Sequence, residues 1–130
     1  MAKLTDDMKK LVANHQAFVA TAGLDGIPNI GTKGSAQVLD DEHLAYYELT
    51  GGRTWANLQN NPMLAIAVVD RNSMQGYRFT GKAEFVTTGE LYDNAKKLSD
   101  MLKIPVPPKA AVKMKVDEIY DLGKGGQKVA

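Results

Sequence analysis

The chain has 130 residues, of which 44% are hydrophobic and 24% charged, a balance typical of one globular domain spanning residues 1–130. Its 16 basic and 15 acidic residues leave a formal net charge of +1, and only 7% of residues are aromatic, so nucleic-acid binding is not expected. The absence of cysteine excludes disulfides, thiolate catalysis and cysteine-ligated metals. The sequence has no signal-like or membrane-spanning stretch, so we expect a cytoplasmic protein with no membrane partner.

The first half of the chain predicts one helix followed by three strands. Thr5 is a suitable N-cap for a short helix over 5–15. Asp25-Gly26 is a strong turn signal after the first strand. Gly31 and Gly34 loosen the second strand, which indicates a bulge or the close approach of another group to the backbone. The three strands are expected over 17–21, 27–39 and 43–49.

The second half predicts two helices and three strands. Thr54 can cap a short helix over 55–60, which must end before Pro62. The strand over 63–69 is apolar on both faces, so we expect the barrel interior on one side and a partner subunit or a helix on the other. The tail over 123–130 is expected to be loose. The other expected features are a half-exposed strand over 77–85, a capping box of Thr87 and Glu90, a helix stripe of Leu91, Ala95, Leu98 and Leu102, and a last strand over 111–122 with a bulge near Asp117 and Glu118.

The resulting order of elements is α-β-β-β-α-β-β-α-β. Antiparallel neighbours joined by short turns, with few helices, favour a mainly β fold. We expect a small closed or half-closed barrel of about six antiparallel strands with two to three helices.

One candidate site is the segment from Gly31 to Ser35. Gly26 and Gly31 have the spacing of a P-loop, but Thr32 precedes Lys33 and no helix begins there, so a nucleotide-triphosphatase is excluded. The segment still offers a cation, two hydroxyls and backbone exposed by glycines, which suit an anion. The alternative is an exposed strand with turn-forming glycines.

A second candidate site is the segment from Gly51 to Trp55. Glycines that lead into a helix leave free amide groups at the positive end of the helix dipole. Arg53 adds a planar set of donors for a phosphate, and Thr54 can cap the helix or bond a phosphate oxygen. The alternative is a capped helix with Arg53 in solvent.

The two segments flank one β-hairpin, and together they are more informative than either alone. A monophosphate carries roughly 1.5 to 2 negative charges at neutral pH. Lys33, Arg53 and one helix N-terminus would neutralise that charge without a metal.

Other polar and aromatic residues give weaker signals. The loop over 70–76 could edge a flat ring or be an ordinary turn, and Trp55 could stack on a ring or pack in the core. His15 and His43 lie far apart in sequence and are typical of surface or helix-end positions. No catalytic triad, metalloprotease motif or close carboxylate pair is present in the sequence, so no catalytic side chain or metal ligand is predicted and the chemistry is expected from a cofactor.

With these segments placed, the sequence resembles the pyridoxamine 5'-phosphate oxidase-like FMN-binding split barrels, especially the short FMN-binding proteins among them. The similar stretch runs over 18–85. Its landmarks are the Asp25-Gly26-Ile27-Pro28 turn, Thr32-Lys33-Gly34-Ser35, Gly51-Gly52-Arg53-Thr54 with Ala56-Asn57-Leu58, Asn61-Pro62, and 76–84 with Gly81-Lys82-Ala83.

The resemblance implies a homodimer with FMN at the subunit interface, although some members of the family bind a deazaflavin or haem. By position, Lys33, Arg53 and Thr54 would hold the phosphate, and Thr32, Gly34 and Ser35 would line the flavin. Trp55 and the 72–75 loop, with Ser73 and Gln75, would lie near the ring or ribityl chain. The full oxidase has an additional C-terminal segment that helps hold its substrate, and this chain ends before it, which argues against that particular activity.

Three functions follow from these observations. The first is a flavin-dependent oxidoreductase that uses a small-molecule electron donor or acceptor. The second is a non-enzymatic FMN-binding or electron-carrier protein, since no substrate-handling residues are recognisable. The third is a barrel without a cofactor that acts as an interaction module.

Overall fold

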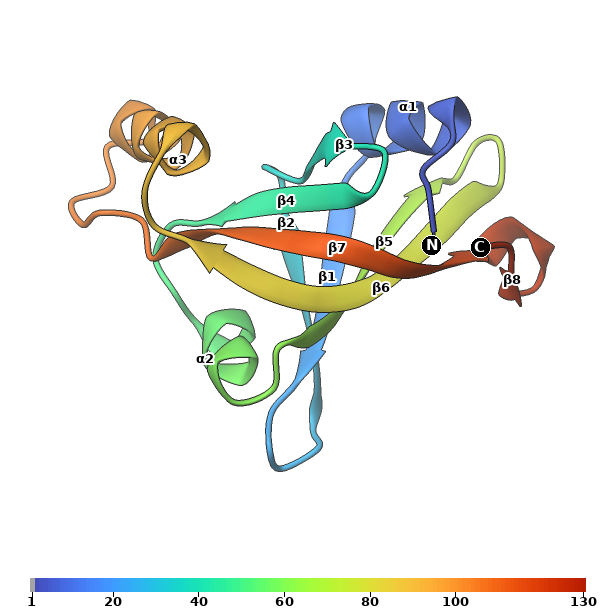
Figure 1. Ribbon diagram of the computed structural model, residues 1–130, viewed down its shortest axis with the longest axis horizontal. Helices are drawn as coiled ribbons and strands as arrows, with labels where there is room; N and C mark the ends of the chain where they lie inside the picture. Colours follow the sequence, from blue (N-terminus) through green and yellow to red (C-terminus); the bar gives the residue numbers. More distant parts are fainter. Residues whose placement is uncertain (1) are drawn as a thin grey trace.

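The computed structural model describes residues 2–130. The chain forms short helices that lie before and between groups of strands (Figure 1). The helices are α1 (Asp6–Asn14), α2 (Arg53–Asn60) and α3 (Glu90–Met101), with a short 3-10 turn η1 (Leu122–Lys124) near the C-terminus. The strands are β1 (Ala17–Ala22), β2 (Pro28–Lys33), β3 (Gln37–Asp40), β4 (His43–Glu48), β5 (Met63–Asp70), β6 (Gln75–Val86), β7 (Ala110–Asp121) and β8 (Gln127–Lys128). None of the helices in the described part of the chain is long and apolar enough to cross a membrane.

The strands form one antiparallel sheet in the order β2-β1-β5-β6-β7-β4-β3, with β8 added to β7. The sheet curls on itself, and its first and last strands are not paired with each other within residues 2–130. This is a split barrel of eight strands, rather than the expected six, with three helices around it. The predicted mainly β, split-barrel class is therefore confirmed.

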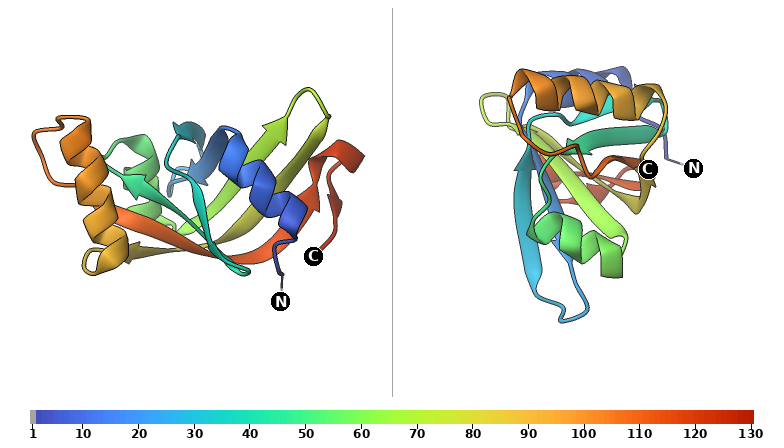
Figure 2. Two further views of the ribbon diagram at one scale, coloured as in Figure 1. Left: turned by 90° about the horizontal axis from the view of Figure 1, so that it is seen from above. Right: turned by 90° about the vertical axis from the view of Figure 1, so that its left-hand side faces the viewer.

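The core fills the inside of the curled sheet. Alternate residues along each strand point inward, as the period of two requires. The largest buried side chains include Tyr46, Phe79, Leu58 and Met114, and α1 adds Met8, Leu11 and Val12 from one side of the barrel. On the opposite side α2 packs against β1 and β2, where their hairpin projects from the barrel (Figure 2).

The predicted strand over 27–39 is wrong, because the structure divides it into β2 and β3. The amide of Ala36 donates to the Lys33 carbonyl at 3.2 Å and closes a turn between the two strands. The Ser35 hydroxyl accepts the Tyr47 backbone N–H at 2.9 Å, which holds this turn on β4. The expected close approach at Gly31 is confirmed, because a Cβ there would lie 2.9 Å from the Thr54 hydroxyl oxygen.

Of the three predicted helix caps, the one at α1 is correct and those at α2 and α3 are wrong. Thr5 caps α1 by accepting the Met8 backbone N–H at 3.3 Å, as predicted. Gly52 rather than Thr54 precedes α2, and Gly89 rather than Thr87 precedes α3, with φ angles of 153° and 90°. A glycine adopts such φ angles without the steric penalty that a side chain would carry. Each helix therefore starts directly after its glycine. Because glycine has no side chain, neither helix has a side-chain cap among the described residues.

Three other predictions concern the C-terminal half. The bulge near Asp117 and Glu118 is confirmed by a register shift between β6 and β7. The loose tail is wrong, because β8 pairs with β7 and the Val129 amide donates to the Ile119 carbonyl at 2.9 Å. The apolar stripe of α3 is only partly buried: Ala95 is 0% exposed and Leu102 is 58% exposed, because α3 projects beyond the end of the sheet (Figure 2).

Candidate functional site

The candidate site is built on the inward side of β2, the edge strand that lies beside α2. Asn29, Gly31 and Lys33 are the less exposed residues of this strand, and Thr32 belongs to the exposed set. Their alternation follows from the period of two in a strand. The side of β2 that carries Gly31 contacts Thr54 of α2, and its end reaches β4 through Lys33.

Lys33 forms a nearly buried ion pair with Glu48 of β4. The ammonium nitrogen lies 3.0 Å and 3.1 Å from the two carboxylate oxygens. The two side chains are 17% and 4% exposed, and the ammonium lies 5.2 Å from the centre of the Tyr46 ring. Because the pair joins the edge strand β2 to β4, it bridges the open side of the barrel.

A pocket of about 400 Å³ opens beside this ion pair. Four of the predicted site residues line it, namely Thr32, Lys33, Gly34 and Ser35. Glu48 lines it as well, and Leu98 of α3 and Leu102, which directly follows α3, form an apolar wall. The pocket therefore combines one compensated cation, several hydroxyl-bearing side chains and an aliphatic surface.

Arg53 lies at the first position of α2 and faces a different hollow. Its guanidinium bonds Asp25 of the β1–β2 turn at 3.1 Å, and the two side chains are 52% and 49% exposed. This hollow measures about 310 Å³ and is also lined by Asn57. The absence of a side-chain cap among the described residues leaves the first amide groups of α2 free to bind an anion.

Thr54 is buried, and it connects α2 to β2. Its hydroxyl oxygen accepts a hydrogen bond from the Asn29 side-chain amide at 3.1 Å. One turn further along α2, Asn57 donates to the Thr21 hydroxyl at 3.1 Å. These two bonds fix the start of α2 against the β1–β2 hairpin, so the two predicted segments lie against each other while their cations face separate pockets.

The sequence analysis did not predict the carboxylate partners of Lys33 and Arg53, which are Glu48 and Asp25. Glu48 gave a readable signal, because it falls on the inward side of the predicted strand with Leu44 and Tyr46. A charged residue at such a position requires a buried partner. Asp25 gave no such signal, because an aspartate without a charged partner is common in a turn.

The tyrosine beneath the ion pair is unusual. Tyr46 is 0% exposed, and its hydroxyl has no hydrogen-bond partner among residues 2–130. Burial, and secondarily the charge of Glu48, raise the pKa of this hydroxyl well above its ordinary range. Burial therefore favours the neutral form of this hydroxyl.

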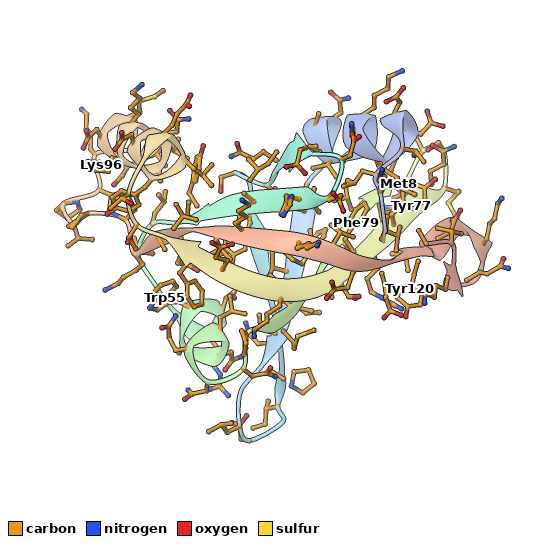
Figure 3. The ribbon with its side chains drawn as sticks, viewed as in Figure 1. Met8, Trp55, Tyr77, Phe79, Lys96 and Tyr120 are labelled. Carbon is orange, nitrogen blue, oxygen red and sulfur yellow. The ribbon has the colours of Figure 1, made fainter. Side chains whose placement is uncertain are left out.

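The remaining predicted residues do not gather at these pockets within one chain. Trp55 packs against Phe85 with ring centres 5.1 Å apart, which is the core packing weighed in the sequence. Ser73 and Gln75 lie at the β5–β6 hairpin, where the Ser73 hydroxyl donates to Asp70 at 2.9 Å. Figure 3 shows Trp55 well apart from Tyr77, which lies near the start of β6.

The two histidines lie against carboxylates at strand ends. His15 is 3.8 Å from Asp70, and His43 is 2.8 Å from Asp40. Hydrogen bonds from Ser73 and from the backbone lower the pKa of Asp70. Within the described residues no cluster of histidine and carboxylate side chains could hold a metal ion.

Comparison with known proteins then decides the family. A family model for pyridoxamine 5'-phosphate oxidase matches residues 4–123. The chain belongs to this family. An uncharacterized protein of Methanocaldococcus jannaschii, MJ0282, is 34% identical over 127 residues, which cover 96% of this chain and 85% of that protein.

Solved structures agree with this family. HupZ of Group A Streptococcus is 39% identical and superposes with a TM-score of 0.84 over 98% of this chain and 99% of that one. A Lactobacillus delbrueckii protein named after the oxidase is 32% identical, with a TM-score of 0.76 over 92% and 95% of the two chains. An FMN-binding protein of Syntrophomonas wolfei and the haem storage protein HutZ of Vibrio cholerae, at 18% and 16% identity, share the fold alone.

Proposed function

We propose that this chain is an FMN-binding flavoprotein that acts as a flavin-dependent oxidoreductase on a small-molecule electron donor or acceptor. The observation that carries the proposal is the start of α2, where Arg53 and amide groups without a side-chain cap lie beside the β1–β2 turn. We assign the separate pocket lined by Thr32, Gly34 and Ser35 to another part of the same cofactor. Flavin, when bound, supplies the electron or hydride transfer, and the chain supplies orientation and a shaped pocket.

The residues at the start of α2 fit a phosphate monoester. Arg53 pairs with Asp25 at an exposed site, where an ion pair contributes less than about 1 kcal/mol. The guanidinium can therefore exchange the carboxylate for a phosphate that accepts two hydrogen bonds from it. The helix dipole and the amide groups add to this attraction, and Thr54 holds the helix start in place.

We further propose a homodimer with the cofactor at its interface. The outward side of the β2-β1-β5 region carries apolar residues that stay exposed in one chain, including Phe18 (43%), Ile30 (71%) and Met63 (49%). Only the inward side of β5 is covered, although its sequence is apolar on both sides. A second copy packed on this surface would bury the exposed residues and bring its own Ser73 and Gln75 toward the flavin.

A non-enzymatic carrier is the second candidate. The two charged side chains that line the pocket, Lys33 and Glu48, are bonded to each other, so no charged side chain of its described lining is without a partner. Rapid mixing of the flavin-loaded protein with NADH or NADPH separates the two functions. Fast bleaching of the flavin supports an enzyme, and its absence with both nucleotides supports a carrier.

The cofactor itself is tested by the visible absorption spectrum of the purified protein, with mass analysis of whatever heating releases. We expect the spectrum of a flavin and the mass of FMN. Arg53→Ala should weaken FMN binding by roughly tenfold or more, since it removes a charge-assisted contact. Lys10→Ala, which removes an exposed cation on α1, is the control. A haem spectrum, or equal FMN binding by both variants, would contradict the proposal.

A further inference from the structure

A groove of about 440 Å³ lies beside the first turns of α3, away from the pockets assigned to the cofactor. Strands β3 and β7 contribute Gln37 and Lys113 to its lining, and the start of α3 contributes Glu90 and Asn94. Among the described residues, it shares no lining side chain with either of the two cofactor pockets. The groove is therefore a separate candidate site, which the flavin function leaves unused.

The register of the sheet explains how the groove forms. Gln37 of β3 pairs with Ala45 of β4, and Ala45 pairs in turn with Lys113 of β7. The neighbours of Ala45 along β4 are the core residues Leu44 and Tyr46, so this row of side chains points away from the core. Because the alanine side chain is short, the longer side chains on either side of it leave a hollow, which the start of α3 borders.

The groove contains one cation and one anion without a charged partner. Lys113 is half-buried, and Glu90 is exposed at the first position of α3. Neither takes part in the ion pairs that residues 2–130 form, and they do not pair with each other. Glu84 lies opposite Lys113 in register but forms no ion pair with it within these residues. A ligand that carries both signs of charge can therefore contact both groups.

Two side-chain amides add hydrogen-bonding capacity without charge. The Gln37 amide nitrogen donates to the Ser35 carbonyl at 3.2 Å, which leaves the Gln37 carbonyl oxygen to accept from a ligand. Asn94 lies one helical turn after Glu90, is half-buried and lines the same groove. Its amide offers both a donor and an acceptor to a ligand.

The remaining lining is mainly aliphatic. Leu39, Val86 and Leu91 line the groove and are only half-buried. An apolar side chain of a ligand would cover these residues, and the removal of this surface from water favours binding. A phosphate or a metal ion has no apolar part, and Glu90 repels the first while Lys113 repels the second.

We propose that this groove binds a small zwitterion of the amino-acid type that carries an apolar side chain. Lys113 binds its carboxylate and Glu90 binds its ammonium group. The Gln37 carbonyl and the Asn94 amide complete the hydrogen bonds of these two groups. The site lies one side chain away from a cofactor pocket, because Gln37 also bonds Ser35, but it goes beyond the flavin function and does not depend on it.

The experiment follows the amide resonances of the isotope-labelled protein by NMR. L-leucine, L-methionine or L-phenylalanine is added at millimolar concentration, both without and with saturating FMN. We expect at least one of the three probes to shift the side-chain amide resonances of Gln37 and Asn94 in both conditions. If none of the probes shifts these resonances, or if FMN displaces the amino acid, the inference is overturned.

Blocked derivatives of the probe that binds most tightly test the two charges on the unmodified protein, so this comparison holds even if a variant fails to fold. The amide derivative lacks the carboxylate, and the N-acetyl derivative lacks the ammonium group. Both should bind more weakly than the parent amino acid, because each loses one charge-assisted contact. If the N-acetyl derivative binds as tightly as the parent, the ligand is a simple carboxylate and the inference is overturned.

Matched variants assign each charge to its residue. Lys113→Met should weaken the parent amino acid by roughly tenfold and leave the amide derivative unchanged. Glu90→Gln should weaken the parent by roughly threefold, the smaller factor because Glu90 is exposed, and leave the N-acetyl derivative unchanged. Lys97→Met, which removes an exposed cation of α3 outside the groove, is the control. Equal binding by Lys113→Met and Lys97→Met would contradict the inference.

Discussion

Removing the Glu48 carboxylate tests the role of the buried ion pair in stability. Glu48→Ala would leave the Lys33 ammonium unpaired at a side chain that is only 17% exposed. The loss of one partner from a buried pair costs about 3 kcal/mol, at the lower end of its range because Lys33 borders an open pocket. For a chain of this size, about 3 kcal/mol corresponds to a fall in Tm of about 11 °C.

The assay is thermal and urea-induced unfolding followed by circular dichroism. The matched control is Glu118→Ala, which breaks the Lys128–Glu118 pair at the same 3.0 Å distance but with side chains 55% and 42% exposed. That pair should contribute less than about 1 kcal/mol. The double variant Lys33→Met with Glu48→Leu should recover most of the loss, because no charge remains buried. Equal losses for Glu48→Ala and Glu118→Ala would refute the reasoning.

Three further predictions concern packing, titration and assembly. Gly81→Ala should lower the free energy of unfolding by about 3 kcal/mol or more in urea titrations, because its Cβ would lie 2.1 Å from a backbone carbonyl oxygen of β7. The control is Gly34→Ala, whose Cβ would meet nothing within 4 Å among the described residues. It should lower the free energy of unfolding far less. Ser73→Ala should raise the pKa of Asp70 toward 3.8 in an NMR titration, because the hydrogen bond from Ser73 holds it lower. The small stabilisation that this hydrogen bond gives is present above about pH 4 and is lost as the pH falls. An unchanged Asp70 pKa would contradict the Ser73–Asp70 hydrogen bond. Phe18→Asp should convert the proposed dimer to monomers in analytical ultracentrifugation, because it places a charge on the exposed apolar surface, and a persistent dimer would exclude this surface as the interface.

Local signals in the sequence predicted the elements that depend on neighbouring residues. The cap at Thr5, the turn at Asp25-Gly26 and the bulge near Asp117 were all recognisable, because each arises from backbone geometry within a few residues. The predictions failed where a distant segment decided the outcome. The turn between β2 and β3 depends on a bond from Ser35 to β4, and the tail is ordered by its pairing with β7.

The sequence by itself determined the mainly β class, the family and the two segments that carry the candidate site. It also determined that both segments contain a cation, and that Gly31 admits the close approach of another element. Residue type and short-range spacing are sufficient for all of these, because they depend on single side chains and on the period of two in a strand.

Only the tertiary structure decided which charges meet. Lys33 and Glu48 are separated in sequence by two turns and strand β3, and they become partners because the curled sheet brings the end of β2 near β4. Arg53 meets Asp25 for the same kind of reason, where α2 packs on the β1–β2 hairpin. The interaction between charges depends on their distance and burial, and neither quantity is set until the sheet has curled around its core.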